Sequence, residues 1–342
     1  MYKNRNTWLA YITWLYIAAI ACWTIAYLFL GDRFGLIALI NMFAIYLFLP
    51  LPLIIAFAVL SRNKPMLTGC IALFFVFMGL WGELFIPKPR YARAYPAEDG
   101  YLSVMTYNLL GWQFNTEVQI ETIRKENADV VLLQELNTKM ADEIHDELAE
   151  IYPYQILNPQ VDVSGMGVIS RYPLDSTGLS LIGEDWVGLP QIVTLEWQGK
   201  PVTLVNIHLA PNLGVMPEVV ERMSRIQQAQ AQVITDFARE KKAVIVGGDT
   251  NVAPLSNAYK IFTSDLSDSW REAGFGLGHS FPGSSIPGSS RPKILGIPVP
   301  KWLVRIDYIF HSNDWRAVSA RMAQFDGVSD HRGIVVMLEW GE

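Results

Sequence analysis

The sequence of 342 residues contains only two cysteines, Cys22 and Cys70, and no cysteine follows residue 70. The large C-terminal region therefore cannot form an internal disulfide and offers no thiolate to a zinc ion. A basic excess is also missing, because residues 97–342 carry 19 Lys and Arg against 31 Asp and Glu, a formal net charge of −12. This charge argues against DNA or RNA as the main partner, although a bound divalent metal ion would supply positive charge locally.

Charged residues are nearly absent from the first quarter of the chain. Three apolar runs lie there, at residues 8–30, 34–60 and 66–86. Only Glu83 is charged in these runs, and Pro50 and Pro52 interrupt the second run. The first run has 23 residues, and about 20 helical residues cross a hydrocarbon core of about 30 Å. It continues through bulky side chains with no small-residue cleavage site, which excludes a cleaved signal peptide. We expect three transmembrane helices within residues 1–86.

The orientation of these helices depends on the positive charges that flank them. Four lie on one side of the expected bilayer and four on the other, namely Lys3, Arg5, Arg62 and Lys64 against Arg33, Lys88, Arg90 and Arg93. Because the first helix usually dominates topology, we expect a cytoplasmic N-terminus and residues 97–342 outside the cytoplasm. The proline-rich stretch 87–100, "PKPRYARAYPAEDG", is typical of an extended linker.

Residues 101–342 alternate between short apolar runs and amphipathic patterns, without internal repeats. Strands are predicted at 101–110, 128–136, 166–174, 191–197, 200–209, 243–249, 305–312 and 332–340, and helices at 115–127, 138–151 and 216–241. The strands at 191–197 and 200–209 are separated by "QGK", which favours a hairpin. Hairpins mixed with helices between strands predict an α+β domain with mixed sheets.

One long segment, residues 278–304, fits neither pattern. It is rich in Gly, Ser and Pro and then turns apolar, with Arg291, Lys293 and Lys301 between Ile294, Leu295, Ile297 and Trp302. Long irregular loops in compact domains are usually functional. This mixture is typical of a segment that lies on anionic headgroups, and a loop packed against its own domain is the alternative.

Polar residues stand at the ends of several predicted apolar strands. They are Asn108, Glu135, His208, Asp249, Asn251, Asp307, Asp330 and His331. Each has an ordinary explanation, such as a turn at Asp249 and Asn251 or an ion pair between Arg305 and Asp307. Together they indicate more, because buried carboxylates are costly unless something pairs with them. A hard divalent cation such as Mg²⁺ would be that partner, and two nearby histidines suit proton transfer and charge stabilisation on a phosphate.

At these residues the sequence resembles the endonuclease/exonuclease/phosphatase superfamily. The motifs "TYN", "LQE", "NIHLAPN", "GGDTN", "RIDYIF" and "SDH" occur in the family's order across residues 103–340. The resemblance implies a four-layer α/β/β/α sandwich, two mixed sheets flanked by helices, at residues 101–342. It also implies hydrolysis of phosphoesters with Mg²⁺ or Mn²⁺.

The resemblance assigns a role to each matching residue. It implies that Glu135 and Asn108 hold the metal, with Asp330 nearby. Asp249 would orient or deprotonate the attacking water, and Asn251 would hold this water and the phosphate.

The remaining matching residues would act on the phosphate itself. His331, oriented by Asp307, would stabilise charge on the phosphoryl oxygens, and His208 would contact the phosphate or the leaving group. Asn212 is a weaker candidate for a phosphate contact. One position departs from the DNA-repair branch, which has an acidic residue where this sequence has Leu110. The departure argues against an abasic-site nuclease.

The apolar helices joined to such a domain resemble the membrane teicoplanin-resistance proteins of bacteria. This resemblance implies a multi-pass protein of the bacterial plasma membrane, with an extracytoplasmic catalytic domain and a lipid-linked phosphate, pyrophosphate or phosphodiester as substrate. Two alternatives remain from the sequence. The chain could be a membrane-tethered nuclease, or a catalytically silent domain that serves as a binding module.

Overall fold

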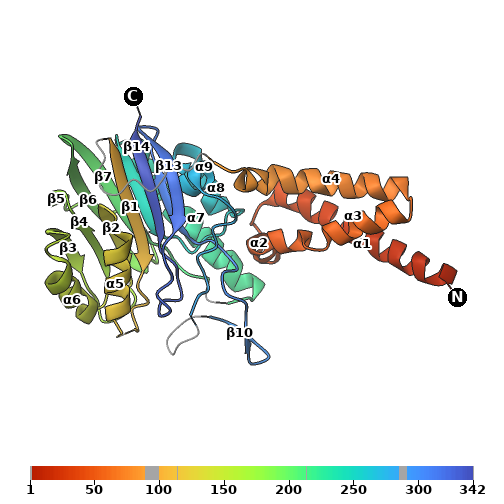
Figure 1. Ribbon diagram of the computed structural model, residues 1–342, viewed down its shortest axis with the longest axis horizontal. Helices are drawn as coiled ribbons and strands as arrows, with labels where there is room; N and C mark the ends of the chain where they lie inside the picture. Colours follow the sequence, from red (N-terminus) through yellow and green to blue (C-terminus); the bar gives the residue numbers. More distant parts are fainter. Residues whose placement is uncertain (1, 89–99, 114, 213, 285–290, 342) are drawn as a thin grey trace.

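The computed structural model of the protein describes residues 2–88, 100–113, 115–212, 214–284 and 291–341. Its N-terminal segment contains α1 (Tyr2–Leu30), α2 (Gly35–Met42), η1 (Ala44–Phe48), α3 (Leu51–Leu60), α4 (Lys64–Trp81) and η2 (Gly82–Phe85). These helices project from one side of a β-sandwich, with the N-terminus at their far end (Figure 1). Of the predicted linker, residues 89–99 lie outside the described residues.

Two of these helices are long and apolar enough to cross a membrane, over Thr7–Leu30 and Lys64–Phe85. The second apolar run differs from the expected single helix, because it forms α2 followed by η1 and α3, with a bend of 69° between the two parts. Pro50 precedes α3 and Pro52 lies in its first turn, so the prolines start a new helix. The expected three spans are therefore present only if this bent pair counts as one span.

The first sheet of the sandwich has six strands in the order β13-β14-β1-β2-β4-β3. Their bounds are β1 (Tyr101–Asn108), β2 (Val130–Gln134), β3 (Tyr154–Asn158), β4 (Met166–Ser170), β13 (Trp315–Met322) and β14 (Ile334–Trp340). Strands β1 and β2 are parallel, and the other neighbours are antiparallel.

The second sheet also has six strands, in the order β5-β6-β7-β8-β12-β9. They are β5 (Leu174–Ser176), β6 (Gly188–Trp197), β7 (Lys200–His208), β8 (Val244–Asp249), β9 (Ser267–Asp268) and β12 (Asp307–His311). The predicted hairpin is present as β6 and β7, and β8 runs parallel to β7. The irregular segment 278–304 contributes a separate two-stranded hairpin, β10 (Lys293–Ile294) with β11 (Ile297–Pro298).

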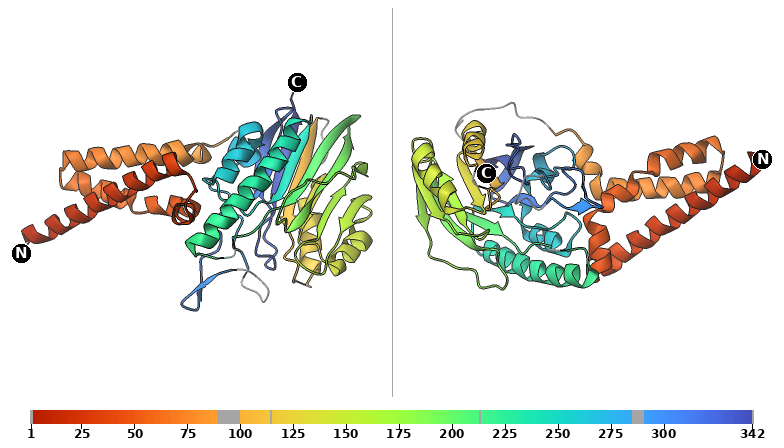
Figure 2. Two further views of the ribbon diagram at one scale, coloured as in Figure 1. Left: turned by 180° about the vertical axis from the view of Figure 1, so that it is seen from behind. Right: turned by 90° about the horizontal axis from the view of Figure 1, so that it is seen from below.

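Helices cover the outer face of each sheet (Figures 1 and 2). They are α5 (Glu117–Glu126) and α6 (Thr138–Leu148) on the first sheet, α7 (Pro217–Arg239) and α8 (Asn257–Asp265) on the second, and the short α9 (Ser269–Ala273) beside β12 and β13. Apolar side chains fill all three interfaces: Ile120, Ile144 and Leu133 under α5 and α6, Val104, Leu132, Ile245 and Ile309 between the sheets, and Ile234, Phe262 and Val246 under α7 and α8. The predicted four-layer sandwich is confirmed.

The N-terminal segment packs directly against the sandwich at α7 and α8. The carboxylate of Asp32, between α1 and α2, accepts hydrogen bonds from Ser224 Oγ at 2.8 Å and from the backbone N–H of Asn257 at 3.0 Å. A Cβ on Gly35 would lie 1.6 Å from the carbonyl oxygen of Pro217, so this approach of α2 to α7 requires glycine. The apolar helices are therefore fixed to the domain through contacts that sequence reasoning did not anticipate.

Candidate functional site

The polar strand ends predicted from the sequence meet at one edge of the sandwich. Asn108 ends β1, His208 ends β7, Asp249 ends β8, Glu135 follows β2, and Asp307 begins β12. Because β1 is parallel to β2 and β7 to β8, these carboxyl ends share an edge, which the arrowhead of β1 marks in Figure 1. Strand β12 is antiparallel to β8 and pairs Asp307 with Asp249.

The two glycines before Asp249 allow close packing here, Gly247 against the opposite sheet and Gly248 against the neighbouring strand. A Cβ on Gly247 would lie 2.6 Å from Leu132 Cδ1 of the opposite sheet. Gly248 has φ of 155°, and a Cβ there would lie 1.9 Å from the carbonyl oxygen of Ile207. The motif "GGD" therefore serves close packing, and it brings Asp249 within reach of side chains on the first sheet.

Asp249, Asp307 and His331 form the centre of the site. Each is buried, and they offer ligand atoms that all lie within 4.8 Å of one another, which makes them a candidate divalent metal site. His331 Nδ1 donates to Asp307 Oδ2 at 2.9 Å, and its Nε2 lies 3.6 Å from Asp249 Oδ2. His208 Nε2 lies 3.5 Å from the same oxygen of Asp249.

Glu135 joins this centre through Asn108. The Nδ2 of Asn108 donates to Glu135 Oε1 at 3.0 Å and to Asp249 Oδ2 at 3.1 Å, so one amide bridges the two sheets. The other oxygen of Glu135 accepts from the N–H of Gly111 at 2.8 Å. Glu135 has φ of 57°, which is uncommon for a residue with a side chain and typical of functional sites.

Burial and mutual charge determine the protonation of these groups. Burial raises the pKa of Asp249 to about 7, although the nearby His331 opposes this shift. Burial alone would lower the pKa of His331, but Asp307 and Asp249 raise it well above its usual value. Burial and the charge of His331 lower the pKa of His208 to about 3. At neutral pH the metal-free site therefore holds a charged His331, a neutral His208 and an Asp249 near its midpoint.

The structure also locates the remaining predicted residues. Asp330 is buried and is close enough to Glu135 to raise that residue's pKa, in addition to the larger effect of burial. The backbone N–H of Asn251 donates to Asp249 Oδ1 at 2.9 Å, and its Nδ2 donates to the carbonyl of Leu209 at 3.0 Å. Asn212 lines a cavity shared with the N-terminal segment, and its buried Oδ1 has no hydrogen-bond partner among the described residues.

The ion pair between Arg305 and Asp307, the ordinary alternative for these two residues, is not formed. Arg305 instead donates from both terminal nitrogens to Asp268, at 2.9 and 2.6 Å, and both residues are buried. Asp268 lies on β9, the edge strand beside β12. This pairing leaves the carboxylate of Asp307 for His331, and Asp307 Oδ1 is buried without a hydrogen-bond partner.

The segment that supports His331 was not predicted as part of the site. The Oγ of Ser280 accepts from the N–H groups of Ile306 and Asp307, and the Ser280 carbonyl accepts from the N–H of Arg332 at 2.9 Å. The next residue, Phe281, packs its ring 5.0 Å from the ring of His331, measured between centroids. The only signal in the sequence was the irregular composition around "GHSFP".

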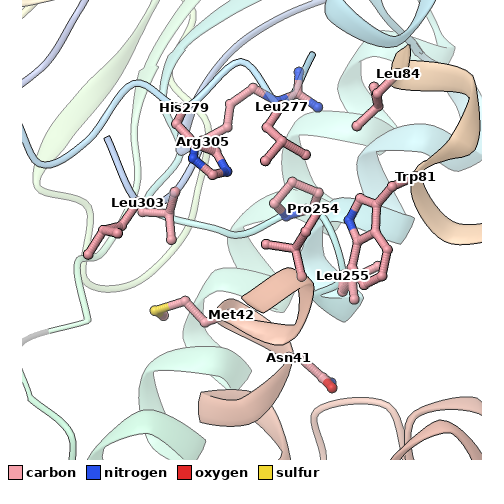
Figure 3. Close-up of a pocket in the computed structure, with 12 residues that line it drawn as sticks. Asn41, Met42, Trp81, Leu84, Pro254, Leu255, Leu277, His279, Leu303 and Arg305 are labelled. Atoms are coloured by element: carbon pink, nitrogen blue, oxygen red, sulfur yellow. The ribbon is translucent and has the colours of Figure 1, made fainter. Parts of the chain in front are cut away.

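The N-terminal segment contacts this supporting segment. Tyr46 of η1 donates to the carbonyl of Leu303 at 2.8 Å, and His279 Nδ1 lies 2.8 Å from the carbonyl of Trp302. A cavity of about 30 Å³ lies here between Met42 and Trp81 of the N-terminal segment and the loops of the sandwich (Figure 3). It has room for a water molecule but not for a lipid chain.

Comparison with known proteins identifies the family. The model of the Endonuclease/Exonuclease/phosphatase family matches residues 105–331. An endonuclease/exonuclease/phosphatase from Beutenbergia cavernae superposes with a TM-score of 0.55 at 21% identity, over 71% of this chain and 72% of that one. D. rerio TDP2 complexed with single-strand DNA product superposes with a TM-score of 0.54 at 17% identity, and the match covers 70% of this chain and 100% of that one. The endonuclease/exonuclease/phosphatase from Bacteroides vulgatus superposes with a TM-score of 0.52 at 18% identity, and the match covers 71% of this chain and 100% of that one.

No curated protein matches the chain. At these identities the solved structures show a shared fold, and the family match covers more than half of the sequence. The chain belongs to the endonuclease/exonuclease/phosphatase family of phosphoester hydrolases.

Proposed function

We propose that this protein is a membrane-anchored, divalent-metal-dependent hydrolase of a lipid-linked phosphate, pyrophosphate or phosphodiester. The observation that carries the proposal is the direct packing of the N-terminal helices on the sandwich that holds the carboxylate–histidine site. Helices α1 and α4 expose many large apolar side chains, as expected for helices in the hydrocarbon layer of a membrane. They include Trp8, Leu15, Phe29 and Phe75. A site fixed beside a bilayer meets lipid substrates at high local concentration.

The donor set fits a divalent cation. Four carboxylates, on Glu135, Asp249, Asp307 and Asp330, gather around a single charged histidine, and Asp307 Oδ1 has no hydrogen-bond partner. Because Asp307 holds His331 through Nδ1 and leaves its Nε2 for a phosphoryl oxygen, we assign the metal to Glu135 with Asn108 and Asp330. Mg²⁺ or Mn²⁺ bound there would polarise a phosphoryl oxygen.

The other residues would carry out the proton and charge steps. Asp249, with a pKa raised to about 7, accepts a proton from the attacking water at neutral pH, while Asn108 and Asn251 fix its two oxygens. His331, held by Asp307 through Nδ1, presents Nε2–H to a phosphoryl oxygen. His208, neutral at this pH, serves as a hydrogen-bonding contact for the phosphate or the leaving group.

The proposed branch and location follow the same reasoning. Apolar N-terminal helices before this domain support membership in the membrane teicoplanin-resistance type of bacterial proteins. We propose the bacterial plasma membrane as the location, with the catalytic domain outside the cytoplasm.

Nuclease activity is the second candidate function. It is favoured by the shared fold with D. rerio TDP2, whose structure contains a single-strand DNA product. The formal net charge of −12 over residues 97–342 weighs against it, because counterion release at a basic surface drives most binding to nucleic acid. A silent binding module is disfavoured because every expected polar residue is present and most of them converge.

The proposal is tested by measuring phosphate or headgroup release by the full-length protein in detergent, with Mg²⁺, with Mn²⁺ and with chelator. The substrates would be a polyprenyl pyrophosphate, a polyprenyl monophosphate, sphingomyelin, a phosphatidylinositol phosphate and plasmid DNA, each also tested with Asp249→Ala. We expect metal-dependent turnover of one lipid that is absent in the variant. Cleavage of DNA alone would establish the nuclease instead, and inactivity on all five would favour the binding module.

A further inference from the structure

The β10–β11 hairpin presents apolar side chains at its tip. Its two strands pair Lys293 with Pro298 and Ile294 with Ile297. Leu295 and Gly296 form the turn, with φ of 50° and 80°. The side chain of Leu295 is 97% exposed and that of Ile297 is 71% exposed. Exposing two neighbouring large apolar residues on an ordered turn is costly in water, so the tip is suited to an apolar environment.

The base of this hairpin is well ordered and connects to the active site. Arg291 donates from Nε and Nη2 to the carbonyl of Val299, at 2.8 and 2.6 Å, which closes the hairpin. After the hairpin, Trp302 packs edge-on against Phe325 with ring centroids 4.9 Å apart. The guanidinium of Arg332, the neighbour of His331, lies 5.2 Å from the centre of the Trp302 ring. The position of the tip is therefore fixed relative to the catalytic histidine.

The hairpin lies near the N-terminal helices and projects from the sandwich crosswise to their length. In Figure 1 it projects below the domain near the level of α2, and the views in Figure 2 place it on the same side as these helices. The hairpin therefore lies near the domain-side end of these helices, where the surface of a bilayer crossed by α1 and α4 would run.

The segment that carries the tip has only positive charges. Residues 273–304 contain Arg291, Lys293 and Lys301 and no Asp or Glu, in a domain with a net charge of −12. Lys293 and Lys301 are both exposed. Basic residues beside an apolar tip complement the phosphates of anionic lipids, which attract lysines close to a membrane surface.

We propose that the tip of the β10–β11 hairpin inserts into the headgroup layer of the bilayer that anchors the protein, with Leu295 and Ile297 inserted and Lys293 and Lys301 on anionic lipid phosphates. This inference rests on the proposed function in one respect, that α1 and α4 span a membrane. It adds a second membrane contact, and this contact fixes the distance and tilt of the active site relative to the lipid surface.

The test uses a fluorescent label on the full-length protein in vesicles. Cys22 and Cys70 are replaced by Ala, and Leu295→Cys is labelled with an environment-sensitive dye. The matched control is Val161→Cys, because Val161 is 88% exposed in the loop between β3 and β4, two strands on the side of the sandwich opposite the helices (Figure 1). The vesicles contain phosphatidylcholine and phosphatidylglycerol, with or without a lipid that carries a spin label near the top of its acyl chain.

We expect the spin-labelled lipid to quench the dye at position 295 and to leave the dye at position 161 at background. Lys293→Glu combined with Lys301→Glu should reduce this quenching in vesicles with phosphatidylglycerol, but not in pure phosphatidylcholine. Equal quenching at both positions, or none at 295, would overturn the proposal. Fluorescence at 295 that follows protein density instead of the spin-labelled lipid would assign the tip to a second copy of the chain. No turnover is measured, so an incorrect substrate assignment cannot affect the result.

Discussion

The bond between Asp307 and His331 gives the sharpest test of the proposed chemistry. Asp307→Asn keeps the size of the side chain but removes the charge that accepts from His331 Nδ1 at 2.9 Å. Asp307 also leads the interactions that raise the pKa of His331. The variant should therefore contain less charged His331 at neutral pH, and its imidazole should lose the orientation that presents Nε2–H to the phosphate.

The expected loss follows from the role of this group. A positioned acid or base contributes about 10²- to 10⁴-fold to turnover, so we expect kcat to fall by about this factor. This loss corresponds to about 2.7 to 5.4 kcal/mol of activation free energy. The assay is metal-dependent hydrolysis of bis(p-nitrophenyl) phosphate, a soluble diester, by full-length protein in detergent. The substrate makes the result independent of any lipid specificity.

Asp314→Asn is the matched control. Asp314 follows the far end of β12 and accepts from the N–H of Ala243 at 2.7 Å and from Ser312 Oγ at 2.9 Å, away from the site. We expect this variant to lose some thermal stability and to keep its turnover. If Asp307→Asn also kept at least a third of wild-type turnover while remaining folded, the assigned role of the Asp307–His331 pair would be wrong.

Three further predictions address the base, its titration and a buried ion pair. Asp249→Ala should abolish turnover and leave the fold intact by circular dichroism, since it removes a transition-state role and not core packing. Wild-type turnover would refute that role. Burial raises the pKa of Asp249 to about 7, so the metal-free wild type should lose free energy of unfolding relative to Asp249→Asn as the pH rises from about 4 to about 7. Denaturant titration at each pH measures this difference, and a difference that stays constant with pH would contradict the raised pKa. Asp268→Asn leaves the buried guanidinium of Arg305 without its carboxylate and should lower the free energy of unfolding by about 3 to 5 kcal/mol. The double variant Asp268→Leu with Arg305→Met should be much less destabilised. Equal losses in the two variants would show that the charge of the pair is unimportant.

Most of the sandwich was predictable because its strands and helices have strong local patterns. The hairpin of β6 and β7 and the long helix α7 follow from their hydrophobic periodicity. The short β5 and β9 and the irregular β3 lack such a pattern, since their pairing depends on neighbours far away in the sequence. The bend after α2 was missed for the same reason, because α2 packs on α7 through Gly35 and Pro217.

The sequence by itself determined the apolar N-terminal runs, an α+β domain with mixed sheets and the identities of the polar strand-end residues, because hydrophobic periodicity and short motifs are local properties. The four-layer arrangement was implied by the resemblance to the family. Only the tertiary structure decided which of these residues meet. It joined Asn108 of one sheet to Asp249 of the other and gave Arg305 to Asp268 instead of Asp307. These partners are more than a hundred residues apart or depend on the order of strands, so sheet pairing and packing select them and no local pattern records them.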